Sequence, residues 1–108
     1  MSPIPLGEFR KLELRVAEIV EVEEIPGTDR LWKLTIDVGS EKKQIVAGIK
    51  NAYSKEALVG RSVVVVNNLE PAVIRGVESK GMLLAAKSGE DLVLVTVDKN
   101  LPAGSLVS

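Results

Sequence analysis

The sequence has 108 residues and contains neither cysteine nor histidine. The first absence excludes disulfides and thiolate nucleophiles, and the second removes the commonest general base and metal ligand. Glycine-rich phosphate loops and nucleophile–base motifs are also absent. We therefore expect no catalytic residue, no metal site and no cofactor, and an enzyme is the least favoured class.

Aromatic residues are scarce, since the chain has one Phe, one Trp and one Tyr. A core built mainly from Val, Leu and Ile favours strands. Generic binders of single-stranded nucleic acid usually present several aromatic stacking platforms, so the scarcity disfavours that class, which stays an alternative.

Long apolar runs are missing as well. No stretch of about 18 residues is apolar enough to span a membrane, and residues 1–9 lack the basic and apolar regions of a secretory signal. Hydrophobic residues make up 45% of the chain, which is typical of a globular protein. We expect one cytoplasmic domain over residues 1–108, with no membrane partner.

Positive charge is concentrated in the middle of the chain. Residues 1–29 carry three Lys and Arg against seven Asp and Glu, whereas residues 30–87 carry ten against five. Residues 88–108 carry one against three, and the net charge of the whole chain is −1. A surface for a polyanion would therefore lie within residues 30–87, although an ordinary solvated surface explains the same distribution.

The spacing of apolar residues predicts short strands throughout. The expected strands lie in 12–22, 32–38, 44–49, 63–66 and a last hairpin of 82–86 and 92–97. A slip in the alternation near residues 17–19 predicts a bulge, and Ser54 is expected to cap a helix over 55–59 that ends at Gly60.

Three strands, a short helix and two more strand units follow the order of an OB-fold. We expect an all-β, five-stranded OB-fold barrel, with the helix between strands 3 and 4 and short extensions at both termini. Alternation on the second strand predicts that Trp32 points inward and Lys33 outward. Core packing is the favoured role for Trp32, and base stacking is the alternative.

The run from Asn68 to Ala86 is the most informative part of the sequence. Apolar strands flank it, and between them lie polar or flexible residues: Arg75, Gly76, Ser79, Lys80, Gly81 and Met82. A buried hairpin does not need so many of them, whereas a surface that receives a charged polymer does. We predict a binding surface here.

The chain resembles the tRNA-binding domain found as the beta subunit or C-terminal extension of methionyl-tRNA synthetase. The matching pieces run through most of the chain: Leu14-Arg15-Val16, Leu31-Trp32-Lys33-Leu34, Asp37-Val38-Gly39, Ile45-Val46-Ala47-Gly48-Ile49, Asn68-Leu69-Glu70-Pro71, Arg75-Gly76, and Ser79-Lys80-Gly81-Met82-Leu83-Leu84-Ala85-Ala86. The last three pieces are specific in combination and weak singly.

This resemblance implies a non-catalytic OB-fold module that recognises the shape of tRNA, mainly its outer corner. The partners it implies are tRNA, the catalytic subunit of methionyl-tRNA synthetase, and a second copy of the chain in a symmetric homodimer. Such a module raises the local concentration of tRNA near the synthetase. Leu6, Leu101 and Leu106 are candidates for the dimer interface.

Together the residues and the resemblance give a predicted tRNA-binding set: Lys33, Lys50, Asn51, Asn68, Arg75, Ser79, Lys80 and Met82. Cations bind phosphate, and Asn and Ser side chains bind phosphate, ribose hydroxyls or base edges. Lys42 and Lys43 are further candidates, with hairpin solubility as the alternative. Val73 departs from the family, whose members commonly carry Lys or Arg there.

Plainer roles compete with several of these assignments. Met82 begins an apolar strand and is equally suited to core packing. Asn68 is suited to a hydrogen bond with backbone near Pro71, and the glycines of the run are suited to turn geometry alone.

A related OB-fold branch acts as a dimeric, export-related chaperone that binds unfolded peptides. That function requires a broader exposed apolar groove. The pieces that begin at Asn68 and Ser79 favour the tRNA branch over this alternative.

Overall fold

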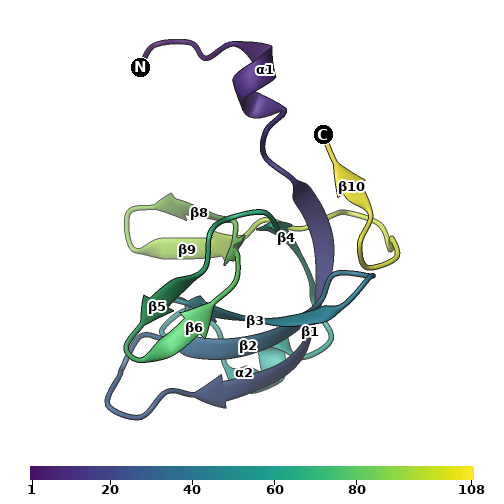
Figure 1. The fold of residues 1–108 in the computed structure, drawn as a ribbon. Coiled ribbons are helices and arrows are strands. Elements are labelled where there is room, and N and C mark those ends of the chain that lie inside the picture. The colour runs from purple at the N-terminus through teal and green to yellow at the C-terminus, as the bar shows by residue number, and fades with distance from the viewer.

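The structure, a computed structural model, describes residues 1–108 and consists mainly of strands (Figure 1). The elements in chain order are α1 (Leu6–Phe9), β1 (Leu14–Glu24), β2 (Trp32–Asp37), β3 (Lys42–Ala47), α2 (Lys55–Leu58), β4 (Ser62–Val66), β5 (Ala72–Ile74), β6 (Val77–Ser79), β7 (Met82–Leu83), β8 (Ala85–Ser88), β9 (Asp91–Leu94) and β10 (Leu106–Val107). Neither helix has the length or apolar character needed to cross a membrane.

The main sheet has the order β3-β2-β1-β4-β7, with β10 also pairing with β1. Strand β1 pairs along its length with different partners. Its first residues, Leu14–Glu18, pair with β4, and its later residues, from Glu18 to Glu24, pair with β2. The register of the second pairing shifts between Ile19 and Glu21, just beyond the predicted slip. A bulge of this kind bends a strand around a barrel. The predicted all-β OB-fold, with its helix between the third and fourth strands, is confirmed.

The barrel interior is filled by aliphatic side chains and one indole. On β2, Trp32, Leu34 and Ile36 are buried, and the residues between them are half-buried. The Trp32 Nε1 donates a hydrogen bond to the carbonyl of Tyr53 at 2.9 Å. Core packing, the favoured role for Trp32, is confirmed, and the indole is not a stacking platform on the surface.

Helix α2 packs against β1 of the barrel. The Ser54 Oγ accepts a hydrogen bond from the Ala57 N at 3.2 Å, as the predicted N-cap requires. Leu58, the last residue of the helix, is fully buried in the core, and Gly60 follows the helix with a φ of 87°. The sequence therefore specified both the start and the end of this element.

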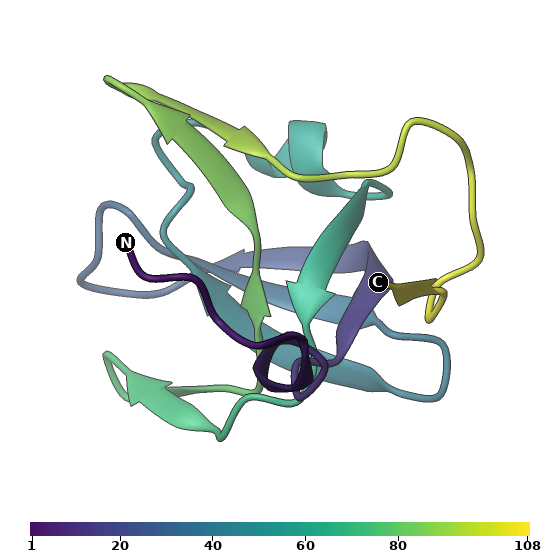
Figure 2. The ribbon, with the colours of Figure 1, turned by 90° about the horizontal axis from the view of Figure 1, so that it is seen from above.

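Strands β5 and β6 form an exposed hairpin that the sequence analysis did not predict. Its two-residue turn is Arg75-Gly76, and both residues have a positive φ, of 53° and 78°. Such a turn matches the twist of paired strands. Part of the run from Asn68 to Ala86, which was interpreted only as a polar, flexible surface, therefore forms a β-ribbon beside the barrel (Figures 1 and 2).

The predicted C-terminal extension contains a strand that the spacing of apolar residues did not indicate. Leu106–Val107 form β10 and pair with the start of β1. The backbones at Gly39 and Gly104 approach closely, since a Cβ at Gly104 would lie 2.7 Å from the Val38 O. Two glycines that face each other let the last strand dock on the barrel.

The N-terminal segment stands away from the barrel. Every residue from 1 to 10 is exposed, and α1 buries none of its side chains. Figure 1 shows both chain ends at the top of the view, the N-terminus above the side of the β8–β9 hairpin and the C-terminus beside β10.

Candidate nucleic-acid interface

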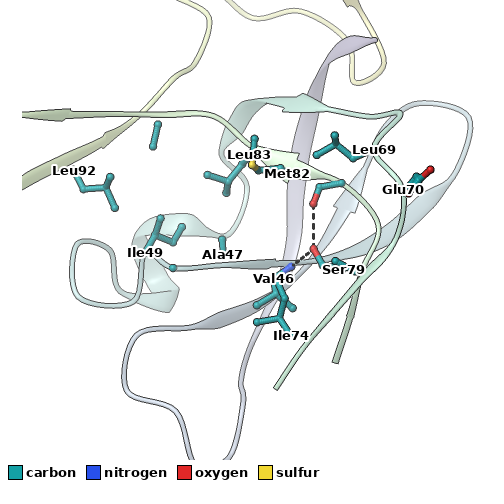
Figure 3. A pocket seen from close by; sticks show the side chains of 14 residues that line it. Val46, Ala47, Ile49, Leu69, Glu70, Ile74, Ser79, Met82, Leu83 and Leu92 are labelled. Carbon is teal, nitrogen blue, oxygen red and sulfur yellow. Dashed lines mark hydrogen bonds between the residues drawn. The ribbon is translucent and has the colours of Figure 1, made fainter. Parts of the chain in front are cut away.

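An apolar pocket of about 420 Å³ opens between the β5–β6 hairpin and the segment that carries β7, β8 and β9 (Figure 3). Ten of its 14 lining residues are hydrophobic. The lining consists of Val46, Ala47, Gly48, Ile49, Leu69, Glu70, Ala72, Ile74, Ser79, Gly81, Met82, Leu83, Ala85 and Leu92. Its wall is therefore the end of β3 and the residues after it, together with the run from Asn68 to Ala86 and Leu92 of β9.

Ser79 contributes to this wall mainly as a structural residue. Its side chain is buried, and its Oγ accepts from the Val46 N at 3.0 Å and donates to the Gly81 O at 3.1 Å. Beside it, the Lys80 N donates to the Gln44 O at 2.9 Å. The hydroxyl thus replaces a backbone carbonyl as the acceptor for the Val46 N–H, at the point where β3 meets residues 78–80 and the barrel closes.

Met82 lies at the mouth of the pocket and is 48% exposed. It therefore belongs to the accessible surface, while its neighbour Leu83 enters the core. The preceding Gly81 has a φ of 143°, and a Cβ there would lie 3.0 Å from the Val66 O. Only glycine fits this close approach easily, so the glycine serves backbone geometry.

Three of the predicted cations are already engaged by carboxylates. The pairs are Lys33 with Glu23 at 3.4 Å, Lys50 with Glu24 at 3.0 Å, and Lys80 with Glu78 at 3.6 Å. A phosphate that binds any of these lysines has to compete with its carboxylate, which weakens the electrostatic attraction expected from the sequence.

Lys50 is the most tightly held of the three. Its ammonium group lies 4.9 Å from the centre of the Trp32 ring, a cation–π distance, and only 22% of its side chain is exposed. The hydrogen bond from Lys50, followed by the charge of the same group, holds the pKa of Glu24 below its ordinary value.

Arg75 is different, because it forms none of the ion pairs in the structure and projects from the hairpin turn. It lines a hollow with residues 27–31, which include Asp29 and Arg30. A second hollow contains Arg30, Asn51, Lys87 and Glu90. This second hollow shares Gly48 and Leu92 with the apolar pocket.

The pocket and these two hollows form one continuous surface, which we call the pocket face. It brings together Asn51, Arg75 and Met82 of the predicted set, with Ser79 in its wall. It also includes Arg30 and Lys87, which the sequence analysis missed. Both lie in connections between expected strands, Arg30 just before 32–38 and Lys87 between 82–86 and 92–97, and this position was the signal that could have identified them.

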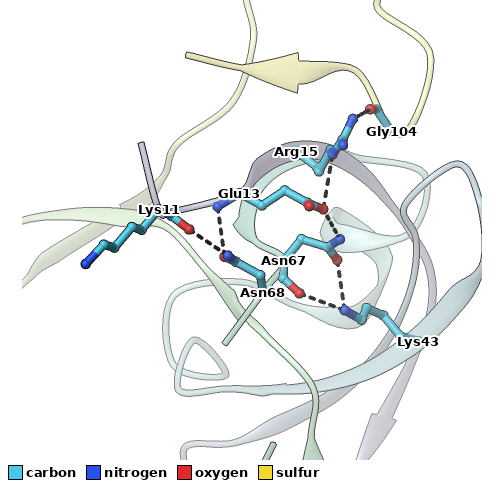
Figure 4. A network of polar contacts seen from close by, with 7 residues as sticks. All are labelled: Lys11, Glu13, Arg15, Lys43, Asn67, Asn68 and Gly104. Carbon is cyan, nitrogen blue, oxygen red and sulfur yellow. Dashed lines mark hydrogen bonds and ion pairs between the residues drawn. The ribbon is translucent and has the colours of Figure 1, made fainter. Parts of the chain in front are cut away.

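Asn68 lies outside the pocket lining, in a polar network at the base of the N-terminal segment (Figure 4). Its Oδ1 accepts from the Glu13 N at 2.8 Å, and its Nδ2 donates to the Lys11 O at 2.7 Å. The side chain does bind backbone, but that of the N-terminal segment and not that near Pro71. Its geometry is that of an anchor for residues 11–13.

Glu13 and Asn67 continue this network. The Glu13 Oε2 accepts from the Asn67 Nδ2 at 2.6 Å and from the Arg15 Nε at 3.3 Å. The Asn67 contact, and then the Arg15 contact, hold the pKa of Glu13 below its ordinary value. Lys43 donates to the Asn67 side chain at 2.8 Å, so this lysine is structural and not a free hairpin cation.

Comparison with known proteins identifies the fold. The sequence model of the family described as "Putative tRNA binding domain" matches residues 14–106. The chain belongs to the tRNA-binding domain family. Over 107 residues it is 51% identical to the methionine–tRNA ligase of Thermotoga maritima, covering 99% of this chain and 17% of that protein.

Two solved structures share the fold of this tRNA-binding domain. A methionyl-tRNA synthetase-related protein from Pyrococcus horikoshii superposes with a TM-score of 0.93 at 35% identity, covering 100% of both chains. The chaperone CsaA of Bacillus anthracis superposes with a TM-score of 0.90 at 30% identity, covering 99% of this chain and 100% of that one. The tRNA branch and the chaperone branch therefore share one scaffold, and sequence identity is higher to the first.

The tRNA-binding domain spans about one sixth of the length of the ligases that it matches. Its pocket face holds hydrogen-bonding groups, three cations outside any ion pair and an apolar hollow. These groups suit reversible binding of a polyanion that also has apolar surface, which describes RNA.

Proposed function

We propose that this chain is a non-catalytic module that binds folded tRNA on its pocket face and delivers it to the catalytic subunit of methionyl-tRNA synthetase. The observation that carries the proposal is the pocket face itself. It combines cations that no carboxylate holds, Arg30, Arg75 and Lys87, with an apolar pocket. Such a role would be performed in the cytoplasm.

Delivery does not require chemistry in this chain. A module that binds tRNA and also associates with a synthetase raises the effective concentration of tRNA at the catalytic site. The likeness to the ligases over nearly the whole chain supports this partner.

The proposal includes a symmetric homodimer. Residues near both termini expose large apolar side chains: Ile4, Leu6, Phe9, Leu12, Leu101 and Leu106. We call this set the terminal face. Leu6 is 60% exposed and Leu106 is 64% exposed, so both side chains are accessible to a second copy of the chain. A dimer through this face would leave both pocket faces accessible for tRNA.

Binding measurements test the proposal. The purified protein is titrated against unfractionated tRNA and against single-stranded RNA of equal length, each at two salt concentrations. We expect tighter binding to tRNA, and affinity that falls as salt rises. Equal affinity for both RNAs would indicate a generic single-strand binder and would contradict recognition by shape.

The second candidate function is peptide binding, as in the chaperone branch. The pocket and the CsaA-like fold favour it, whereas Arg30, Arg75 and Lys87 around the pocket favour an anion. Titration with an unfolded, apolar polypeptide separates the two. Binding of that polypeptide in the absence of any tRNA binding would replace the first candidate with the second.

A further inference from the structure

The electrostatics of the pocket face are weaker than those of a typical RNA-binding surface. Asp29 and Glu90 line the same hollows as the free cations, and Glu70 borders the pocket. The chain as a whole has a net charge of −1. Phosphate contacts alone therefore supply little attraction, and a tRNA binder of this composition needs a contact of another kind.

The apolar pocket is placed to supply that contact. Ile74, which lines it, directly precedes Arg75 at one border. At the other border, Gly48 and Leu92 are shared with the hollow that contains Lys87. An RNA backbone held by cations on both sides of the pocket would pass over its mouth.

The parts of RNA that can enter an apolar pocket are few. Phosphates and riboses are polar, whereas a base has two apolar faces that become available when it leaves a stack. The volume of the pocket falls within the range of about 300–1,000 Å³ that is usual for ligand sites. Met82 adds a flexible thioether at the mouth, which makes favourable contacts with aromatic rings.

We infer that the pocket takes an unstacked nucleobase of the bound RNA. The wall of Val46, Ile49 and Leu92 covers one face of the base, Met82 covers the other, and the cations hold the adjoining phosphates. This inference rests on the proposed function, and it names the chemical group that the site selects. It predicts a preference for RNA with unpaired, splayed bases over a fully paired duplex.

Two neighbouring alanines give a matched test. Ala85 lines the pocket and pairs across the hairpin with the buried Leu94. Ala86 pairs with the exposed Val93 and faces away from the pocket. Since both residues are exposed, Ala85→Leu and Ala86→Leu are expected to fold alike, and only the first narrows the pocket.

The readout is affinity for unfractionated tRNA and for a fully paired RNA duplex. We expect Ala85→Leu to lose about tenfold in affinity for tRNA, the scale of one base contact, with an unchanged salt slope and unchanged duplex binding. Ala86→Leu should match the wild type on both RNAs. Wild-type affinity of Ala85→Leu for tRNA would overturn the inference, and so would an equal loss on both RNAs.

Chemical footprinting gives a second, direct readout. Dimethyl sulfate modifies unpaired adenine and cytosine, and a carbodiimide reagent modifies unpaired uracil and guanine. With both reagents, a base of any kind seated in the pocket is protected in the wild-type complex and exposed again with Ala85→Leu. Absence of any protected base would contradict the inference while tRNA binding itself persists. Absence of all tRNA binding by the wild type would instead refute the proposed function. A last outcome concerns peptide. If an apolar peptide displaces tRNA from the wild type but not from Ala85→Leu, and no base is protected, the pocket binds peptide and the inference is overturned.

Discussion

The pocket face and the terminal face both expose apolar side chains, but they differ in shape and in what surrounds them. The pocket face is concave, rests on buried strands of the barrel and carries Arg30, Arg75 and Lys87. The terminal face consists of exposed side chains from both ends of the chain, and α1, which carries part of it, buries none of its own side chains. A hollow with free cations suits a charged ligand that has an apolar part, whereas a projecting apolar segment suits a matching protein surface. Exposed apolar area by itself therefore does not distinguish a ligand site from a subunit interface.

The largest expected effect follows from breaking the terminal face. The double variant Leu6→Glu and Leu106→Glu should convert the proposed dimer into a monomer, because charge in an apolar interface is strongly unfavourable. Light scattering measures the change in mass. Val93→Glu, at an exposed position on the β8–β9 hairpin, serves as the control and should stay dimeric. A wild type that is already monomeric would refute the dimer.

The next effect is a loss of stability when the Ser79 hydroxyl, which holds the pocket wall together, is removed. Ser79→Ala leaves the buried Val46 N–H without a partner and should lower the free energy of unfolding by about 1–3 kcal/mol. Urea denaturation measures this loss. Ser88→Ala, in the exposed end of the last hairpin, is the control and should cost little. A loss of RNA affinity by Ser79→Ala at unchanged stability would instead indicate that the hydroxyl contacts RNA.

Ser79 and Asn68 show how far the sequence predicts the site. The strands, the bulge, the capped helix and an inward Trp32 follow from local periodicity and capping, which are visible in one sequence. The hydrogen-bond partners of Asn68 and Ser79 cannot be seen in one sequence, because Asn68 binds the backbone 55 and 57 residues away and Ser79 binds Val46. A motif shows that a polar residue matters, but long-range pairing determines whether it faces a ligand or the fold.

The same limit applies to charge and to the missed hairpin. Lys33 and Lys50 were interpreted as free cations, but the carboxylates that hold them, Glu23 and Glu24, both lie at the end of β1. The turn of the β5–β6 hairpin requires a positive φ at Arg75, a conformation that a non-glycine residue seldom adopts. Local propensity therefore gave no warning of it.

The contrast between free and engaged cations gives a further prediction. Arg75→Ala should lower tRNA affinity and reduce the slope of log affinity against log salt by about one, the effect of one lost phosphate contact. Lys33→Ala should change the slope less, because Glu23 already neutralises that ammonium group. Fluorescence anisotropy at several salt concentrations measures both variants. Lys99→Ala, outside the pocket face, is the control. If Arg75→Ala kept the wild-type salt slope, Arg75 would not be part of the binding site.

Freeing an engaged cation should have the opposite and smaller effect. Glu24→Gln removes the carboxylate that holds Lys50, so the ammonium group becomes available to phosphate. We expect tRNA affinity to rise by about twofold at low salt, and the gain to vanish as salt screens the surface. The control is Glu56→Gln, which removes an equal charge from an exposed residue of α2 outside these ion pairs. An equal gain for both variants would mean that only net charge matters.

The smallest expected effect is a pH dependence of stability. It distinguishes the contacts that anchor the N-terminal part of the terminal face, through Glu13, from those that anchor the pocket face, through Ser79. Because contacts with Asn67 and Arg15 lower the pKa of folded Glu13, this carboxylate stabilises the fold above its unfolded pKa, near 4.5. The contribution disappears as the pH falls through the folded value. Urea midpoints of the wild type and of Glu13→Gln should therefore differ at neutral pH and converge in acid. Ser79→Ala, whose lost contact does not titrate, should keep a constant difference over the same range. Convergence of Ser79→Ala with the wild type, or a pH-independent difference for Glu13→Gln, would contradict this separation.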